Sequence, residues 1–155
     1  MTNVAGCELC DLSVPAVWAG PKFSVIIVED ANYPGFCRVI WRDHVREMSD
    51  LSREDRLLVN EAVHQLELAV REVMQPLKVN VASLGNVVPH LHWHVIPRYA
   101  DDAHFPAPVW AQASRQADEA TLAARRALLP QLADAIVRRF NQFQQEEQAC
   151  PTQPT

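Results

Sequence analysis

The sequence lacks the long apolar segments that mark a membrane protein. No hydrophobic run among the 155 residues approaches the roughly 18–20 residues that a helix needs to cross a bilayer. The N-terminus also lacks the basic start and the apolar stretch of a secretory signal peptide. We therefore expect a cytoplasmic protein with no membrane partner.

Basic residues are scarce as well. Lysine and arginine total 14 against 19 aspartates and glutamates, which gives a formal net charge of −5 at pH 7. Binding to a nucleic-acid backbone needs a clustered basic excess, so we expect no nucleic-acid partner. The chain also lacks internal repeats and low-complexity linkers, and 48% of its residues are hydrophobic. These values indicate one globular domain with a hydrophobic core.

The four cysteines are too few for a disulfide framework in a chain of this length. Cys7 and Cys10 form a C-x-x-C pair, which in a reducing compartment is either half of a metal site or a redox couple. A redox pair usually opens a helix, whereas the residues that follow Cys10, with Pro15 among them, begin a helix poorly. The pattern favours half of a metal site.

Hydrophobic patterning predicts four strands, in residues 23–28, 36–42, 78–84 and 90–97. Ser52 caps an amphipathic helix that ends near Gln75, and residues 114–148 are expected to be helical with a break at Pro130. This order predicts an α+β fold, in which an antiparallel sheet carries a long helix on one face. The domain then consists of a main body and a helical C-terminal extension, residues 1–113 and 114–155.

Three of the six histidines alternate in the last predicted strand, at His90, His92 and His94. Side chains along a strand point alternately to its two faces, so all three imidazoles are expected on one face and the apolar residues between them on the other. Packing explains such a face poorly, because neighbouring imidazoles disfavour each other's charged form. The pattern therefore indicates a functional site.

Two chemistries suit this cluster. Strand histidines can ligate a catalytic zinc ion, or a neutral imidazole can attack phosphorus while its neighbours stabilise the charge. A catalytic zinc usually needs a carboxylate that acts on its water, and no carboxylate follows the cluster before Asp101. The preceding Gly85–Val87 loop offers backbone and amide donors to phosphate oxygens. These residues favour attack on phosphorus, with a zinc hydrolase built on the three histidines as the alternative.

The run from His90 to Ile96 resembles the pattern of the histidine triad (HIT) family, in which three histidines alternate with apolar residues. Tyr33-Pro-Gly35, His44 and the Gly85-Asn86 pair also resemble that family in type and position. The resemblance implies a HIT-like antiparallel sheet and a homodimer with a shared sheet. It also implies hydrolysis or transfer at the α-phosphate of a nucleotide, usually adenosine, through a covalent nucleotidyl-histidine.

Carried over by position, the resemblance implies a catalytic role for each histidine. His92 would be the nucleophile. The main-chain carbonyl of His90 would accept the Nδ1–H of His92 and leave Nε2 free to attack. His94 would bind and neutralise phosphate oxygens.

Other residues are expected to bind the nucleotide. Asn86 stands where relatives usually have glutamine, and Val87 stands where they often have a hydroxyl residue. The expected contacts are Asp30 to the ribose, with Glu29 as the alternative, Asn86 to the scissile or leaving oxygen, Asn80 to a polar group, His94 to phosphate and Trp110 to the base. Alternatively, Asp30 and Asn86 are turn residues, and Trp110 packs against the final helices. Arg98 either meets phosphate or is an ordinary surface residue.

Some bacterial-type triad proteins hold a structural zinc ion with an N-terminal C-x-x-C pair and two histidines. The matching residues here are Cys7, Cys10, His44 and His90, which form a closed set of four ligands. Such an ion ties the irregular N-terminus to the strand that orients His92. An ordinary surface position for His44 is the alternative. We expect no organic cofactor.

The expected activity is therefore nucleotidyl hydrolysis or transfer through His92. The substrate is a purine nucleotide, either a dinucleoside polyphosphate or a nucleoside phosphoramidate. A catalytically silent nucleotide-binding or adaptor protein is the other alternative, besides the zinc hydrolase.

Overall fold

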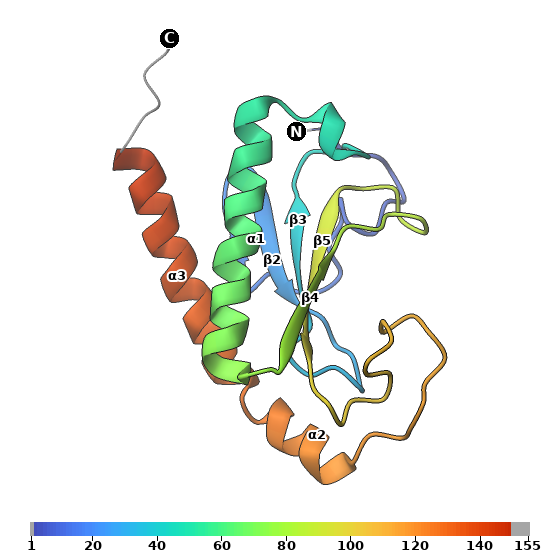
Figure 1. Ribbon diagram of the computed structural model, residues 1–155. Helices are drawn as coiled ribbons and strands as arrows, with labels where there is room; N and C mark the ends of the chain where they lie inside the picture. The colour runs from blue at the N-terminus through green and yellow to red at the C-terminus, as the bar shows by residue number, and fades with distance from the viewer. Residues whose placement is uncertain (1, 150–155) are drawn as a thin grey trace.

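The protein is built on a five-stranded antiparallel sheet with helices on one face (Figure 1). The computed structural model describes residues 2–149. The strand order is β1-β2-β3-β5-β4, with bounds Trp18–Ala19, Phe23–Ile27, Cys37–Trp41, His92–Arg98 and Lys78–Ala82. A 3-10 helix η1 and three α-helices, α1 to α3, complete the fold; their bounds are Met48–Asp50, Arg53–Met74, Glu119–Arg126 and Leu129–Ala149. The predicted α+β class is confirmed.

The long helix α1 begins and ends where its sequence predicts. The Ser52 side chain accepts a hydrogen bond from the backbone N–H of Asp55 at 3.0 Å, which satisfies one of the free donors of the first turn. Residues at helical spacing, such as Val59, Leu66 and Val70, are fully buried against the sheet. The chain leaves the helix at Gln75 in the left-handed conformation.

The C-terminal helix α3 extends the same core. The α3 helix packs against α1, and Ile136 and Phe140 are buried with the residues of α1 in one cluster (Figure 1). Pro130 lies in the first turn of α3, as predicted, where its missing N–H costs no helical hydrogen bond. Residues 150–155 of the predicted extension lie outside the described residues. None of the helices within residues 2–149 combines the length and apolar character needed to cross a membrane.

The strands differ from the prediction in two places: one strand begins later, and one short strand was not predicted. The β5 strand begins at His92 and not at His90, because the backbone N–H of His90 donates to the carbonyl of Val88 in a turn. His90 therefore lies in the loop before the strand. The two-residue strand β1, which pairs with β2, was not predicted because two residues carry no readable alternation.

The two faces of the sheet have different surroundings. Val25, Val39 and Val95 are fully buried beneath α1. On the other face, register pairs Ile40 with His92 and Arg38 with His94. The N-terminal segment covers one end of this second face, with Leu9 packed on Ile26 and Ile40, and the chain after β5 covers the other end, with Val109 packed near Phe36 and Ile96. The histidines lie between these two coverings.

A buried ion pair anchors the chain that follows β5. Arg98 is only 2% exposed, and its Nε donates to Asp102 Oδ2 at 2.8 Å. The other guanidinium nitrogens donate to the carbonyl of Ala107 and to Asn80 Oδ1. Asp102 in turn accepts hydrogen bonds from three backbone N–H groups, those of Tyr99, His104 and Phe105. This network fixes the loop that carries Trp110.

Asp102 is expected to make stability depend on pH in the acid range. Burial on its own raises the pKa of Asp102, but hydrogen bonds from Arg98 and the three backbone N–H groups outweigh it and lower the pKa from 3.8 to about 2. A lowered pKa in the folded state stabilises the fold above the unfolded-state pKa, and this contribution is lost as the pH falls from about 4 to about 2. We expect Asp102→Asn to lower the free energy of unfolding at pH 7 by about 3–5 kcal/mol, because it leaves Arg98 buried without its counter-ion.

Urea unfolding at a series of pH values measures both effects. Between about pH 4 and pH 2, the free energy of unfolding of Asp102→Asn should fall less steeply with decreasing pH than that of the wild type. Asp134→Asn, at an exposed position on α3, is the matched control and should change stability by less than about 0.5 kcal/mol. Equal slopes of stability against pH for the wild type and Asp102→Asn would contradict this role.

Candidate functional site

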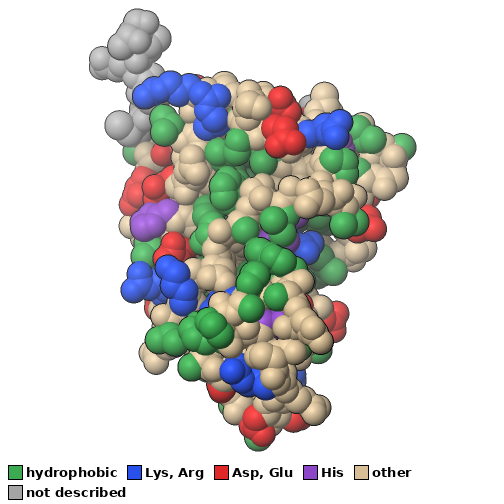
Figure 2. Space-filling view, turned by 45° about the vertical axis from the view of Figure 1, so that its right-hand side comes forward, with side chains coloured by type: hydrophobic (Ala, Val, Ile, Leu, Met, Phe, Trp, Pro, Cys, Tyr) green, Lys and Arg blue, Asp and Glu red, His purple; other side chains and the backbone are tan. Residues whose placement is uncertain are grey.

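A cavity of about 530 Å³ opens on the sheet face that α1 does not cover. This volume lies in the range of small-molecule binding sites. Figure 2 shows this side of the molecule, where histidine and basic side chains emerge between hydrophobic ones. The lining residues come from the N-terminal segment, β3, the loop before β5, β5 itself and the chain after it: Glu8, Leu9, Arg38, Leu84, Gly85, Asn86, Val87, Val88, His92, His94 and Trp110.

His92 is held in a defined tautomer at the floor of this cavity. Its Nδ1 lies 2.6 Å from the main-chain carbonyl oxygen of His90. A carbonyl oxygen only accepts, so Nδ1 carries the proton and Nε2 keeps its lone pair. The His94 ring lies beside it, with 4.9 Å between the ring centroids. This arrangement suits a neutral imidazole that acts as a nucleophile or as a hydrogen-bond acceptor.

The surroundings keep both rings in their uncharged form. Burial lowers the pKa of His92, and the positive charge of Arg38 lowers it further, against the opposing effect of the His90 carbonyl. The pKa of His94 is lowered to about 4, first by burial and then by Arg38 and His92. At neutral pH, His94 therefore acts as a neutral donor or acceptor and does not supply positive charge.

Arg38 is a basic lining residue that was not predicted from the sequence. It lies on β3 directly opposite His94 and is half-buried. Its Nε is buried without a hydrogen-bond partner among residues 2–149, and so is His94 Nε2. A sequence signal existed, since a charged residue interrupts the apolar run from Cys37 to Trp41. Only the pairing of β3 with β5 shows that this charge faces the histidines.

The predicted nucleotide contacts fall into two groups. Asn86 and Trp110 line the cavity, and Trp110 is 57% exposed there. Asp30 instead closes a turn, since its Oδ1 accepts from the backbone N–H groups of Asn32 and Tyr33. The side chain of Asn80 accepts a hydrogen bond from Arg98. Arg98 is itself buried in the ion pair with Asp102, so it is neither an ordinary surface residue nor a residue of the cavity. Within the described part of the chain, Asp30 and Asn80 are not among the lining residues.

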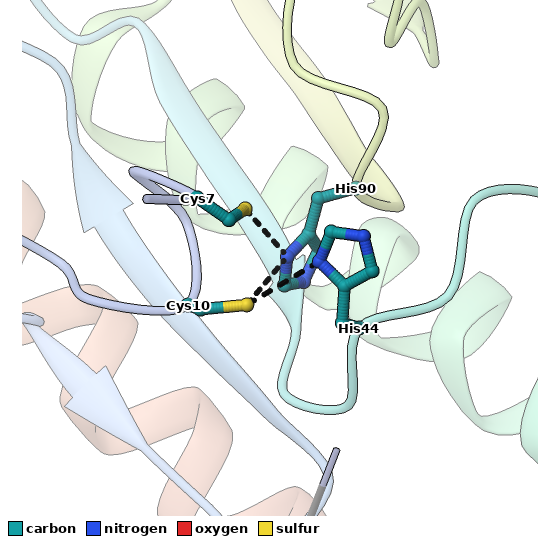
Figure 3. A group of neighbouring side chains, drawn as sticks. All are labelled: Cys7, Cys10, His44 and His90. Atoms are coloured by element: carbon teal, nitrogen blue, oxygen red, sulfur yellow. Dashed lines mark hydrogen bonds between the residues drawn. The ribbon is translucent and has the colours of Figure 1, made fainter. Parts of the chain in front are cut away.

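The four predicted metal ligands come together next to this cavity. Figure 3 shows the side chains of Cys7 and Cys10, from the N-terminal segment, pointing toward those of His44 and His90. The Sγ of Cys7 lies 3.4 Å from Nδ1 of His90, and the Sγ of Cys10 lies 3.3 Å from Nδ1 of His44 and 3.6 Å from Nδ1 of His90. His44 is thus part of the cluster.

This cluster has the geometry of a tetrahedral metal site. All four ligand atoms lie within 4.8 Å of one another. A tetrahedral Zn²⁺ bonds sulfur at about 2.3 Å and nitrogen at about 2.0–2.1 Å, which places such atoms roughly 3.5 Å apart. His90 Nε2 donates to the carbonyl oxygen of Trp41 at 2.6 Å, so its Nδ1 presents a lone pair to the cluster. The Cys₂His₂ cluster could therefore hold a metal ion.

Histidine triad proteins are among the solved structures with a similar fold. A histidine triad protein from Bradyrhizobium japonicum is 29% identical, covers 81% of this chain and 89% of its own, and gives a TM-score of 0.65. A histidine triad protein from Marinobacter aquaeolei VT8 is 27% identical, and the match covers 83% of this chain and 95% of that protein with a TM-score of 0.64. A Zn-bound histidine triad family protein from Mycobacterium smegmatis is 24% identical, and the match covers 83% of this chain and 94% of that protein with a TM-score of 0.50.

The sequence itself matches the HIT domain over residues 16–101, which is more than half of its length. No curated protein matches it at a significant level. The matched range contains β1 to β5 and α1, with the histidines of the cavity. The resemblance seen in His90, His92 and His94 is confirmed by this match: the chain belongs to the HIT domain family.

Proposed function

We propose that this protein is a nucleotidyl hydrolase or transferase, in which His92 attacks the α-phosphate of a purine nucleotide. The observation that carries the proposal is the 2.6 Å hydrogen bond from His92 Nδ1 to the carbonyl oxygen of His90. It leaves Nε2 with a lone pair in a cavity large enough for a nucleotide. Membership of the HIT domain family, whose members typically act on nucleotides, supports the same chemistry.

The proposed reaction has two steps. In the first, the lone pair of His92 Nε2 forms a P–N bond to the α-phosphorus, and the bond from phosphorus to the leaving oxygen or nitrogen breaks with its electron pair. In the second, a water oxygen attacks the same phosphorus and the P–N bond breaks. The nucleoside monophosphate leaves, His92 is neutral again, and the proton of the water passes to solvent or to the leaving group.

The residues around His92 suit the stabilisation of a phosphoryl group. The neutral ring of His94 lies beside His92, and Asn86 and the backbone of Gly85 line the same cavity. Trp110 offers an exposed aromatic surface for the base. Contacts from Asp30 and Asn80 to the nucleotide stay predictions, since one closes a turn and the other binds Arg98. A dinucleoside polyphosphate and a nucleoside phosphoramidate are the two candidate substrates.

The arrangement does not favour a zinc hydrolase that uses all three histidines. Both ring nitrogens of His90 are already engaged, Nδ1 with the cysteine cluster and Nε2 with the Trp41 carbonyl. His90 therefore cannot turn a ring nitrogen to an ion shared with His92 and His94 without breaking these contacts.

We also propose that the Cys₂His₂ cluster holds a structural Zn²⁺. The support is a closed set of two sulfur and two nitrogen donors at tetrahedral spacing, and a histidine triad protein of the same fold is Zn-bound. When bound, the ion supplies a cross-link between the N-terminal segment and the sheet. His90 would then be held from both sides of its ring, and with it the carbonyl oxygen that orients His92.

A homodimer through the open edge of β4 is the third part of the proposal. The β4 strand is the last in the sheet order, and it pairs only with β5 in the described residues. Large exposed hydrophobic side chains lie on this strand, just before it and in the loop after it: Leu77, Val81, Leu84 and Val87. An open edge with apolar side chains is a surface on which a second copy of the strand can pair.

Intact-protein mass spectrometry tests the nucleophile. After a brief reaction with an adenosine dinucleotide polyphosphate, the wild type should gain the mass of one adenylyl group, and His92→Ala should gain none. The quench must not be acidic, because acid cleaves the P–N bond. We expect His92→Ala to lower kcat/KM by at least about a thousandfold, as for the loss of other covalent nucleophiles. His64→Ala, at an exposed position on α1, is the control and should keep the adduct. Turnover by His92→Ala at the wild-type rate would refute the mechanism.

Metal analysis and thermal unfolding test the zinc site. The wild type should contain about one Zn²⁺ per chain, and a chelator should lower its Tm by roughly 10 °C. This estimate follows because a ligand at about a thousand times its Kd stabilises a fold by about 4 kcal/mol, and each kcal/mol moves the Tm of a domain of this size by roughly 2–4 °C.

Two variants test whether the ion is bound by the Cys₂His₂ cluster and not by another cysteine. Cys10→Ser should lose the ion, whereas Cys37→Ala, which removes a buried thiol outside the cluster, should keep it. A wild type prepared without added chelator that contains no zinc would overturn this part of the proposal.

Light scattering tests the dimer. The wild type should have twice the chain mass, and Val81→Lys should shift it to the monomer, because a charge on an edge strand opposes pairing. Val137→Lys is the matched control, since this valine on α3 is equally exposed, at 37% against 38% for Val81. Dissociation by both variants, or by neither, would contradict pairing through β4.

A further inference from the structure

Two side chains of opposite charge line the cavity, and the proposed reaction leaves both without a role. Among the described lining residues, Arg38 is the only basic one and Glu8 the only acidic one. Burial lowers the pKa of the Arg38 guanidinium, and the negative charge of Glu8 raises it, so the two groups are close enough to interact. No hydrogen bond or ion pair joins them within residues 2–149. A ligand that offers both acceptors and donors can therefore lie between them.

The accessible part of Arg38 is the end of its guanidinium group. Its Nε is buried, whereas the two terminal nitrogens keep accessible surface, and none of the three has a hydrogen bond in the described part of the chain. The guanidinium lies 5.5 Å from the centroid of the Phe36 ring, which supports it. Arg38 thus offers the cavity a planar group whose terminal N–H donors have no partner in the protein.

The segment around Glu8 places its carboxylate beside Arg38. A backbone hydrogen bond of 3.1 Å joins the two cysteines that flank Glu8 and Leu9, and it closes a turn. Leu9 packs on Ile26, and Ile26 lies opposite Arg38 in the register of β2 and β3. The turn therefore covers the strand next to Arg38, and the exposed side chain of Glu8 lines the cavity there.

The aromatic residue proposed for the base lies at the same end of the cavity. Trp110 follows Val109, which packs on the cluster that contains Phe36, the ring beneath Arg38. The loop before β5 lines the opposite end, because that strand begins at His92. Along the sheet, Arg38 lies two residues beyond the level of His92, which is about 7 Å. A nucleotide with its α-phosphate at His92 and its base on Trp110 therefore brings the edge of the base toward Arg38 and Glu8.

The two charged groups match guanine better than adenine. Guanine presents two adjacent acceptors, N7 and O6, to a guanidinium, and two adjacent donors, N1–H and the N2 amino group, to a carboxylate. Adenine has a donor next to an acceptor on each edge, which suits an amide side chain. A phosphate group at this end would accept from Arg38 but would be repelled by Glu8. The pair of charges therefore favours a base over a phosphate.

We propose that Arg38 and Glu8 bind the edge of a guanine base that stacks on Trp110, and that they make the cavity select guanosine over adenosine nucleotides. This inference rests on the proposed function, because it assigns the base of the substrate in the same cavity. Adenosine compounds remain weaker substrates, since stacking on Trp110 and attack by His92 serve both purines. Arg38 and Glu8 bind the base and do not touch the bond that breaks.

Calorimetric titration with GMP, IMP and AMP measures the selection directly, because the three nucleotides share their sugar and phosphate. The wild type should bind GMP at least about tenfold more tightly than AMP, as expected for a bidentate contact to a base. IMP lacks the N2 amino group and should have an intermediate affinity. Equal affinities for GMP and AMP would overturn the inference.

Variants of the two residues should affect different parts of the base. Glu8→Gln should weaken GMP by about five- to tenfold and IMP by less, because IMP has one donor fewer for the carboxylate. Arg38→Met should weaken GMP and IMP equally, since both have O6 and N7. Neither variant should change the affinity for AMP by more than about twofold. Arg38→Lys keeps the charge but loses the planar pair of donors, so it should also lose the preference, and it serves as the test if Arg38→Met does not fold.

Two control variants distinguish selection from general damage to the cavity. Glu61→Gln and Arg71→Met change exposed residues of α1, on the other face of the sheet, and should keep the wild-type preference. Equal losses of GMP and AMP binding in the Glu8 and Arg38 variants would mean that these residues only shape the cavity. That result would overturn the inference, and so would a guanine preference that survives all three of these variants.

The binding experiment and the nucleotidyl adduct fail independently. If GMP is preferred through Glu8 and Arg38 but neither a diguanosine nor a diadenosine polyphosphate forms an adduct on His92, the base subsite stands and the proposed function fails. If both dinucleotides form the adduct with the same kcat/KM, and GMP and AMP bind equally, the function stands and this inference fails.

Discussion

The hydrogen bond between the carbonyl oxygen of His90 and Nδ1 of His92 is the interaction on which the site depends. It determines which nitrogen of His92 carries a proton, and therefore which one is free to react. His90 can hold this carbonyl in place because its own ring is fixed on both sides. One ring nitrogen donates to the carbonyl of Trp41 on β3, and the other faces the sulfur atoms of Cys7 and Cys10. One residue thus connects the cysteine cluster, the sheet and the reactive imidazole.

The charge distribution of the cavity follows from burial. Imidazoles that are removed from water and placed beside a guanidinium stay neutral, so they can offer a lone pair or an N–H without electrostatic repulsion between them. The positive charge is concentrated in Arg38, which stays protonated even when half-buried because of the high intrinsic basicity of its guanidinium. The proposed nucleophile and the positive charge are therefore separate groups on adjacent strands, with His94 opposite Arg38 in register.

The walls of the cavity come from two irregular segments, and each is anchored by a polar cluster. The Cys₂His₂ cluster holds the N-terminal segment, which brings Glu8 and Leu9 to the cavity. The buried pair of Arg98 and Asp102 holds the chain after β5, which brings Trp110 to the opposite side. Neither segment has regular secondary structure to fix it, so the side-chain contacts replace the backbone ladder that a strand would provide.

Local patterns determined much of this protein. The helical spacing of α1, the antiparallel pair of β2 and β3 and the family motif around His92 are all readable from the sequence, because each depends on residues that are near one another in the chain. The start of β5, the burial of Arg98 and the place of Arg38 opposite His94 were decided by tertiary structure. These features depend on competition between a local turn and a strand, and on the register of strands that are more than 50 residues apart in the chain. Such contacts contribute free energy only once the sheet has formed.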